Sequence, residues 1–155
     1  MKPKKKAKAG KKFINKQVPL AGLAIKHGFY LDALLILSSI MESRLRSVIT
    51  RVQKENPGPG LSLERCIKRI KHLRLTHPDP MLEKTFDVQM IDSLRNWKNR
   101  RNDVLKDFTR IHVSKKRTEK LTQEGILLLR DLNSSSKKFK AEWKASLQSS
   151  SVPVP

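Results

Sequence analysis

The sequence has few of the features that mark secreted, zinc-binding or membrane-spanning proteins. Cys66 is the only cysteine, so no disulfide can form within the chain and a zinc site built on several cysteines is excluded. The longest apolar run, residues 30–41, contains Asp32 and two serines. It is much shorter than the roughly 20 residues that a membrane helix needs. We therefore expect a cytoplasmic protein without a membrane segment.

Motifs for metals and cofactors are also missing. The four histidines are scattered, and no two of them have the spacing of metal ligands. Residues 56–60 alternate glycine with proline and lack the Lys-Ser/Thr pair of a phosphate-binding loop. We expect neither a metal nor a cofactor. Cys66 falls on the apolar face of a predicted helix, which favours structural burial over a role as a nucleophile.

Acidic residues are scarce. The chain has 14 Asp and Glu against 34 Lys and Arg, a formal net charge of +20. This balance favours a polyanionic partner, nucleic acid first and acidic lipid second. Residues 1–17 hold eight lysines and no acid, which predicts a disordered basic arm that contacts phosphate or keeps the protein soluble. We assign residues 18–147 to one domain and residues 148–155 to a disordered tail.

Hydrophobic periodicity predicts an all-α protein, an antiparallel bundle of four to five helices. The predicted helices cover residues 18–26 and 29–53, begin again at Ser62, cover residues 81–108 after an Asp79-Pro80 start, and run from a Thr118 cap to about residue 147. Serines at 134–136 are expected to weaken the last helix. Gly125 falls on its apolar stripe, which indicates close contact with another helix despite the poor helix propensity of glycine.

One stretch, residues 94–108, combines core and polar features. Leu94, Trp97, Val104, Leu105 and Phe108 share one face of a helix. Arg101 falls on the same face, so its charge must either enter a polar cleft or reach back to the surface. We interpret Trp97 as a core residue, with base stacking as the alternative.

Two segments resemble the HEPN superfamily, whose all-α domains include RNA-cleaving toxins, defence nucleases and RNA-binding relatives. The first is Gly28-Phe29-Tyr30-Leu31-Asp32-Ala33-Leu34-Leu35-Ile36-Leu37, followed by Ile40-Met41-Glu42 and Leu45-Arg46. The second is Trp97-Lys98-Asn99-Arg100-Arg101-Asn102-Asp103-Val104-Leu105-Lys106. The likeness extends over about residues 20–147. Within the first segment, the spacing of Glu42 and Arg46 predicts an ion pair along one helix.

The resemblance implies that Arg101 and Asn102 contact phosphate, in a cleft where two copies of the motif meet across a homodimer. In the family, a histidine four to six residues after the arginine supports cleavage by the RNA 2′-hydroxyl. This chain has Lys106, or Asp107 with one more residue of spacing, where that histidine is expected, and His112 lies too far along. Histidine suits proton transfer near neutral pH. The likeness therefore supports RNA contact better than cleavage.

Three functions follow as hypotheses. The first is an RNA-binding protein that holds RNA in a basic, dimeric cleft without efficient cleavage. The second is a metal-independent endoribonuclease of toxin or defence type, with Arg101 and Asn102 as catalytic residues and an antitoxin as a partner. The third is a helical adaptor in a protein or ribonucleoprotein complex. The expected RNA-binding residues are Arg95, Lys98, Arg100, Arg101, Lys106, Arg110, Lys115, Lys116 and Arg117.

Overall fold

The computed structural model describes residues 17–58, 60–76, 79–110 and 113–150, and all regular structure within these ranges is helical. A helix over residues 17–26 is followed by α2 (Tyr30–Gln53), α3 (Leu63–Thr76), α4 (Pro80–Thr85), α5 (Val88–Thr109) and α6 (Lys115–Ser149). The predicted all-α bundle is confirmed. Residues 1–16 of the predicted arm and 151–155 of the predicted tail lie outside the described residues.

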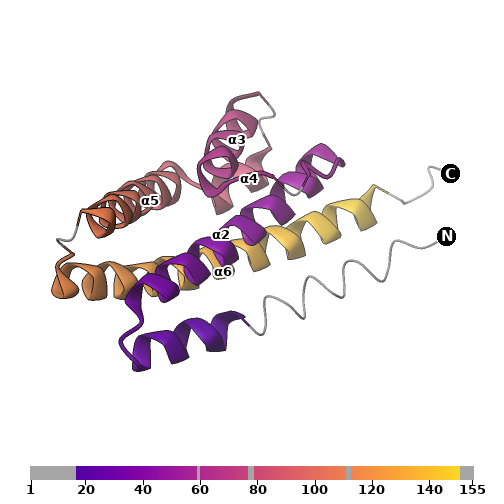
Figure 1. Ribbon diagram of the computed structural model, residues 1–155. Coiled ribbons are helices and arrows are strands. Elements are labelled where there is room, and N and C mark those ends of the chain that lie inside the picture. The colour runs from indigo at the N-terminus through magenta and orange to yellow at the C-terminus, as the bar shows by residue number, and fades with distance from the viewer. Residues whose placement is uncertain (1–16, 59, 77–78, 111–112, 151–155) are drawn as a thin grey trace, which may run out of the picture.

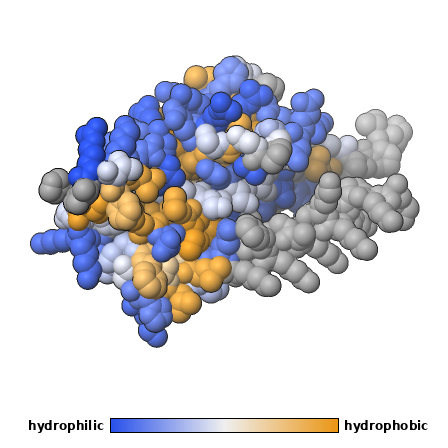
Figure 2. Space-filling model, viewed as in Figure 1, coloured by the Kyte–Doolittle hydropathy of each residue, from blue (hydrophilic) through white to orange (hydrophobic). Residues whose placement is uncertain are grey.

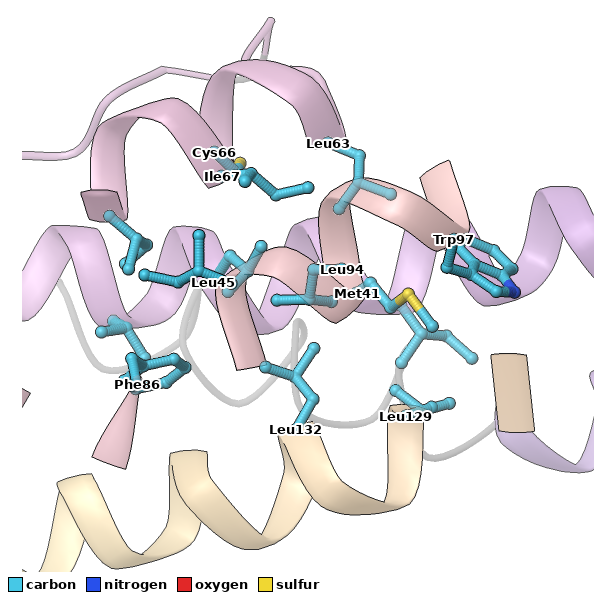
Figure 3. Packing of buried hydrophobic residues seen from close by; sticks show 14 of the residues in the cluster. Met41, Leu45, Leu63, Cys66, Ile67, Phe86, Leu94, Trp97, Leu129 and Leu132 are labelled. Carbon is cyan, nitrogen blue, oxygen red and sulfur yellow. The ribbon is translucent and has the colours of Figure 1, made fainter. Parts of the chain in front are cut away.

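The central helix of the bundle is α2, which packs against α3, α5 and α6. Figure 1 shows α2 and α6 side by side along much of their lengths. Further contacts join α5 to α3 and α6, and α4 to α6. Figure 3 shows the side chains that meet between these helices, among them Met41, Leu45, Leu63, Cys66, Ile67, Leu94, Trp97, Leu129 and Leu132.

The turn before α2 depends on a glycine. Gly28 has φ of +76°, a left-handed conformation that residues with a side chain rarely adopt. Its N–H donates to the carbonyl of Ile25, and the next N–H, of Phe29, donates to the carbonyl of Ala24. This pair of bonds is the Schellman arrangement that ends helices. The sequence therefore fixes where the helix of residues 17–26 ends and lets α2 fold back along it.

The predicted helix over residues 81–108 is wrong in one respect, because the structure divides it into α4 and α5. Asp79 does cap α4 as expected, and its carboxylate accepts a bond of 2.9 Å from the Met81 N–H. The break follows at Phe86, whose side chain is fully buried and packs edge-on against Phe139. Asp87 then caps α5 by accepting from the Met90 N–H at 2.8 Å.

The last helix begins earlier and runs longer than predicted. Ser114, not Thr118, is its N-cap, and Ser114 Oγ accepts from the Arg117 N–H. Thr118 is buried inside the helix and donates its hydroxyl to the Ser114 carbonyl. The serines at 134–136 do not interrupt α6, because Leu132, Ser136 and Phe139 hold this section in the core.

Gly125 of α6 packs closely against α5, as predicted. A Cβ atom at this position would lie 2.8 Å from three atoms of the Trp97 indole. The Trp97 side chain is 1% exposed, and its Nε1–H donates to the Leu121 carbonyl at 2.9 Å. The interpretation of Trp97 as a core residue is confirmed. The predicted apolar stripe is wrong at the end of α5, however, because Phe108 is 56% exposed although Val104 is buried.

Cys66 is fully buried between α3 and α2, and this burial raises the pKa of its thiol to about 11. The folded protein should therefore react with a thiol reagent at about pH 8 at least about a hundredfold more slowly than the unfolded chain. Since the folded-state pKa lies above the ordinary one, the associated stabilisation is present below about pH 9 and is lost as the pH rises through 11. A Cys66→Ala variant should lack this component in denaturation measured against pH. Equal labelling rates with and without denaturant would contradict the assignment.

Candidate nucleic-acid interface

Arg101 projects from α5 towards α2. Its Nη1 donates to Ser38 Oγ at 2.6 Å, and its Nη2 and Nε donate to Asn102 Oδ1 at 2.6 and 3.2 Å. Ser38 is buried and in turn donates its hydroxyl to the Leu34 carbonyl at 2.9 Å. The guanidinium is thus held at a defined place between two helices by two neutral oxygen atoms.

The same bonds leave part of the guanidinium available. Arginine has five N–H donors, and the three bonds to Ser38 and Asn102 use three of them. One N–H remains on each terminal nitrogen, and no carboxylate of the described residues forms an ion pair with Arg101. The N–H groups of a guanidinium are good donors to the oxygens of a phosphate.

Glu42 is the acidic residue whose charge acts on the Arg101 guanidinium. Burial lowers the pKa of Arg101, and the charge of the Glu42 carboxylate acts in the opposite direction. The predicted Glu42–Arg46 ion pair is not formed. Instead Glu42 Oε1 accepts from the Leu63 N–H at 2.9 Å, and Arg46 Nη2 donates to the Leu61 carbonyl at 3.0 Å. Both side chains reach across to the start of α3, where the unbonded N–H groups of a helix attract a carboxylate.

Four of the expected RNA-binding cations are paired with acids instead of being free on the surface. Arg95 bonds Asp92 on its own helix, and Arg100 pairs with Glu124 of α6. Lys98 is 8% exposed and lies 3.7 Å from Glu64 of α3. Its ammonium group therefore joins α5 to α3. Arg117 pairs with Asp107 at 3.0 Å, so one of the two positions expected for the motif histidine is a structural carboxylate.

The other four cations lie at the ends of α5 and α6 that the chain joins directly. Lys106 is in the last turn of α5 and Arg110 follows it, while Lys115 and Lys116 open α6. All four are exposed, and none forms an ion pair with a described residue. We call these four residues the hairpin cations. They place four cations close together in the sequence and at one end of two helices, each without a carboxylate of the described residues at ion-pair distance.

No family model, curated protein or solved structure matches this chain. Within the described ranges, no helix is long and apolar enough to span a membrane, and no three His, Cys, Asp or Glu side chains gather as metal ligands do. Sequence reasoning assigned Arg101 and Asn102 to one site, and in the structure their side chains are bonded to each other. It missed Ser38 and Glu42, because nothing in the periodicity of α2 indicates that these two side chains face α5 and α3.

Proposed function

We propose that this chain is an RNA-binding protein of HEPN-like type that holds RNA without efficient cleavage. One observation carries the proposal. α5 presents Arg101, held by Ser38 and Asn102 with two N–H groups to spare, and it ends at the unpaired hairpin cations. The net charge of +20 agrees with a polyanionic partner.

In this proposal the two parts of the surface have different tasks. The hairpin cations attract the phosphate backbone by releasing bound counterions, which favours RNA of any sequence. Arg101 binds one phosphate in a fixed orientation, because Ser38 and Asn102 hold its guanidinium in place before RNA binds. The lysines of residues 1–17 add further attraction. As the resemblance implies, two copies form a homodimer that brings both Arg101 side chains to one cleft. The single cysteine favours a reducing compartment such as the cytoplasm.

Binding without cleavage is favoured by what occupies the expected histidine positions. Lys106 is exposed and Asp107 is bound to Arg117. The imidazole that suits proton exchange with RNA near neutral pH is therefore missing from both positions. Mixed RNA incubated with the protein in EDTA should therefore stay intact. Cleavage that disappears in an Arg101→Ala variant would favour the endoribonuclease instead.

The Arg101 contact is tested by substitution. Arg101→Ala should weaken RNA binding by about tenfold or more, the usual effect of removing a charge-assisted bond. Arg101→Lys should restore only part of the affinity, because an ammonium keeps the charge but loses the two-pronged geometry. RNA affinity is measured by fluorescence anisotropy at about 0.1 M salt.

Arg95→Ala is the matched control. Arg95 is exposed on the same helix and already bound to Asp92, so its removal should change RNA affinity by less than about twofold. Thermal denaturation checks that all variants are folded. If RNA affinity were unchanged both in Arg101→Ala and in a chain without residues 1–16, the proposed function would be wrong.

A further inference from the structure

A groove lies on the side of the bundle where the helix of residues 17–26 packs beside α2 and α6. It has a volume of about 570 Å³. Its apolar lining consists of Val18, Ala21, Leu37, Ile126 and Leu129. Figure 2 shows hydrophobic surface gathered over the helix of residues 17–26 and the beginning of α2. The groove is formed by different side chains from those of the RNA site, since neither Arg101 nor any hairpin cation lines it.

The polar part of the groove is positive. Arg130 and Lys137, two turns apart on α6, both line it, and no acidic residue does. Both are exposed and neither forms an ion pair with a described residue. The eight lysines of residues 1–17 directly precede the helix that forms one wall. An occupant of the groove would therefore be stabilised by negative charge.

One buried polar atom of the groove has no partner among the described residues. Asn133 lines the groove, and its Oδ1 is buried without a donor. Buried polar atoms are normally bonded, so an occupant that brings an N–H group to this oxygen is favoured. A peptide can do so through a side chain or through the unbonded N–H groups at the start of a helix.

We propose that this groove binds an acidic amphipathic helix of a partner protein. The apolar side chains of that helix lie against Leu37, Ile126 and Leu129, and its carboxylates pair with Arg130 and Lys137. This is the usual way in which a helix occupies a hydrophobic groove. RNA has phosphates for the cations but no apolar side chains for the leucines. The chain's own residues 1–16 carry lysines and no acid, so their charge opposes that of the groove.

Gly22 offers a steric test that changes no charge. It lines the groove, and a Cβ placed on it meets nothing within 4 Å, so a larger side chain there fills the groove without disturbing the fold. The probe is a fluorescent helical peptide of about 18 residues with leucines on one face and glutamates flanking them. We expect Gly22→Leu to weaken its binding at least about tenfold in anisotropy measurements, and Arg130→Gln with Lys137→Gln to weaken it similarly.

Three controls decide the outcome. A peptide with lysine in place of every glutamate should not bind. Arg65→Gln with Lys71→Gln, which removes two exposed charges from α3, should change acidic-peptide affinity by less than about twofold. Binding of the acidic peptide that survives Gly22→Leu would reduce the effect to general attraction by a positive protein and overturn the proposal. So would no preference for the acidic peptide, or a loss of RNA binding in Gly22→Leu in place of a loss of peptide binding.

Discussion

Trp97→Ala is expected to lower the free energy of unfolding by about 3–5 kcal/mol, the usual cost of emptying a buried tryptophan site. Trp97 is 1% exposed, and the substitution also removes the bond from its Nε1–H to the Leu121 carbonyl. For a chain of this size the midpoint of thermal unfolding should fall by roughly 6–20 °C. Trp143→Ala is the control. Trp143 is only partly buried at the edge of the core, so the same truncation should cost clearly less. Equal losses at the two positions would contradict this placement of Trp97.

Gly125→Ala should destabilise the fold for the opposite reason, because it adds an atom where none fits. The new Cβ would lie 2.8 Å from the Trp97 indole. Overpacking of this kind costs about 1–3 kcal/mol, against up to about 1 kcal/mol regained in helix propensity. Gly22→Ala is the matched control on the helix of residues 17–26. Its Cβ meets nothing within 4 Å, so the substitution should stabilise the protein by about 0.5–1 kcal/mol.

The two sites should be strongly coupled. In a Trp97→Ala background the obstacle to a Cβ at residue 125 is gone, and Gly125→Ala should change from destabilising to neutral or stabilising. A double-mutant cycle by chemical denaturation measures this coupling. If Gly125→Ala destabilised the protein equally with and without the indole, then the close approach of α5 and α6 at Trp97 would be wrong.

This pair also shows which part of the fold the sequence predicts well. A glycine on an apolar stripe has few explanations other than close packing, and Trp97 falls on the stripe that faces it. Helix caps are predicted less reliably. The sequence predicts the cap at Thr118, but Thr118 is buried inside α6, and the helix begins four residues earlier at Ser114. The break at Phe86 follows from its packing on Phe139, a contact across 53 residues that helical periodicity does not report.

Some features of the candidate site can likewise be predicted from the sequence, and others depend on how the helices pack. Arg101 was identified because a charge on an apolar face is unusual, and it does lie half-buried. Its contact with Ser38 is 63 residues away in sequence and depends on how α5 crosses α2. The sequence also does not predict which cations pair with acids. Lys98 looks like any other surface lysine in the sequence, yet its placement beside Glu64 follows from the packing of α3 on α5. Which cations stay unpaired therefore depends on the packing of the helices.

The unpaired charge leads to the largest expected effect on binding. Reversing Lys106, Lys115 and Lys116 to glutamate together should weaken RNA binding by about a hundredfold or more at about 0.1 M salt. Each phosphate contact on a single strand contributes a slope of about −0.7 to log affinity against log salt. Three lost contacts therefore remove about two orders of magnitude at this salt concentration, and the slope should become shallower by about 2. Affinity measured by anisotropy over a salt series tests both numbers.

Arg65, Arg69 and Lys71 of α3 provide the comparison, because reversing these three exposed residues changes the net charge by the same amount. A binding surface confined to the hairpin cations predicts a much smaller loss for the α3 triple, through the weaker overall field alone. Glutamates at 115 and 116 fall in the first turn of α6, where the helix dipole favours negative charge, but a glutamate at 106 falls in the last turn of α5, where it does not. Thermal denaturation therefore checks that both triple variants are folded. Equal losses in the two triples would mean that RNA follows the net charge of the protein. The two ends of α5 and α6 would then not be the site.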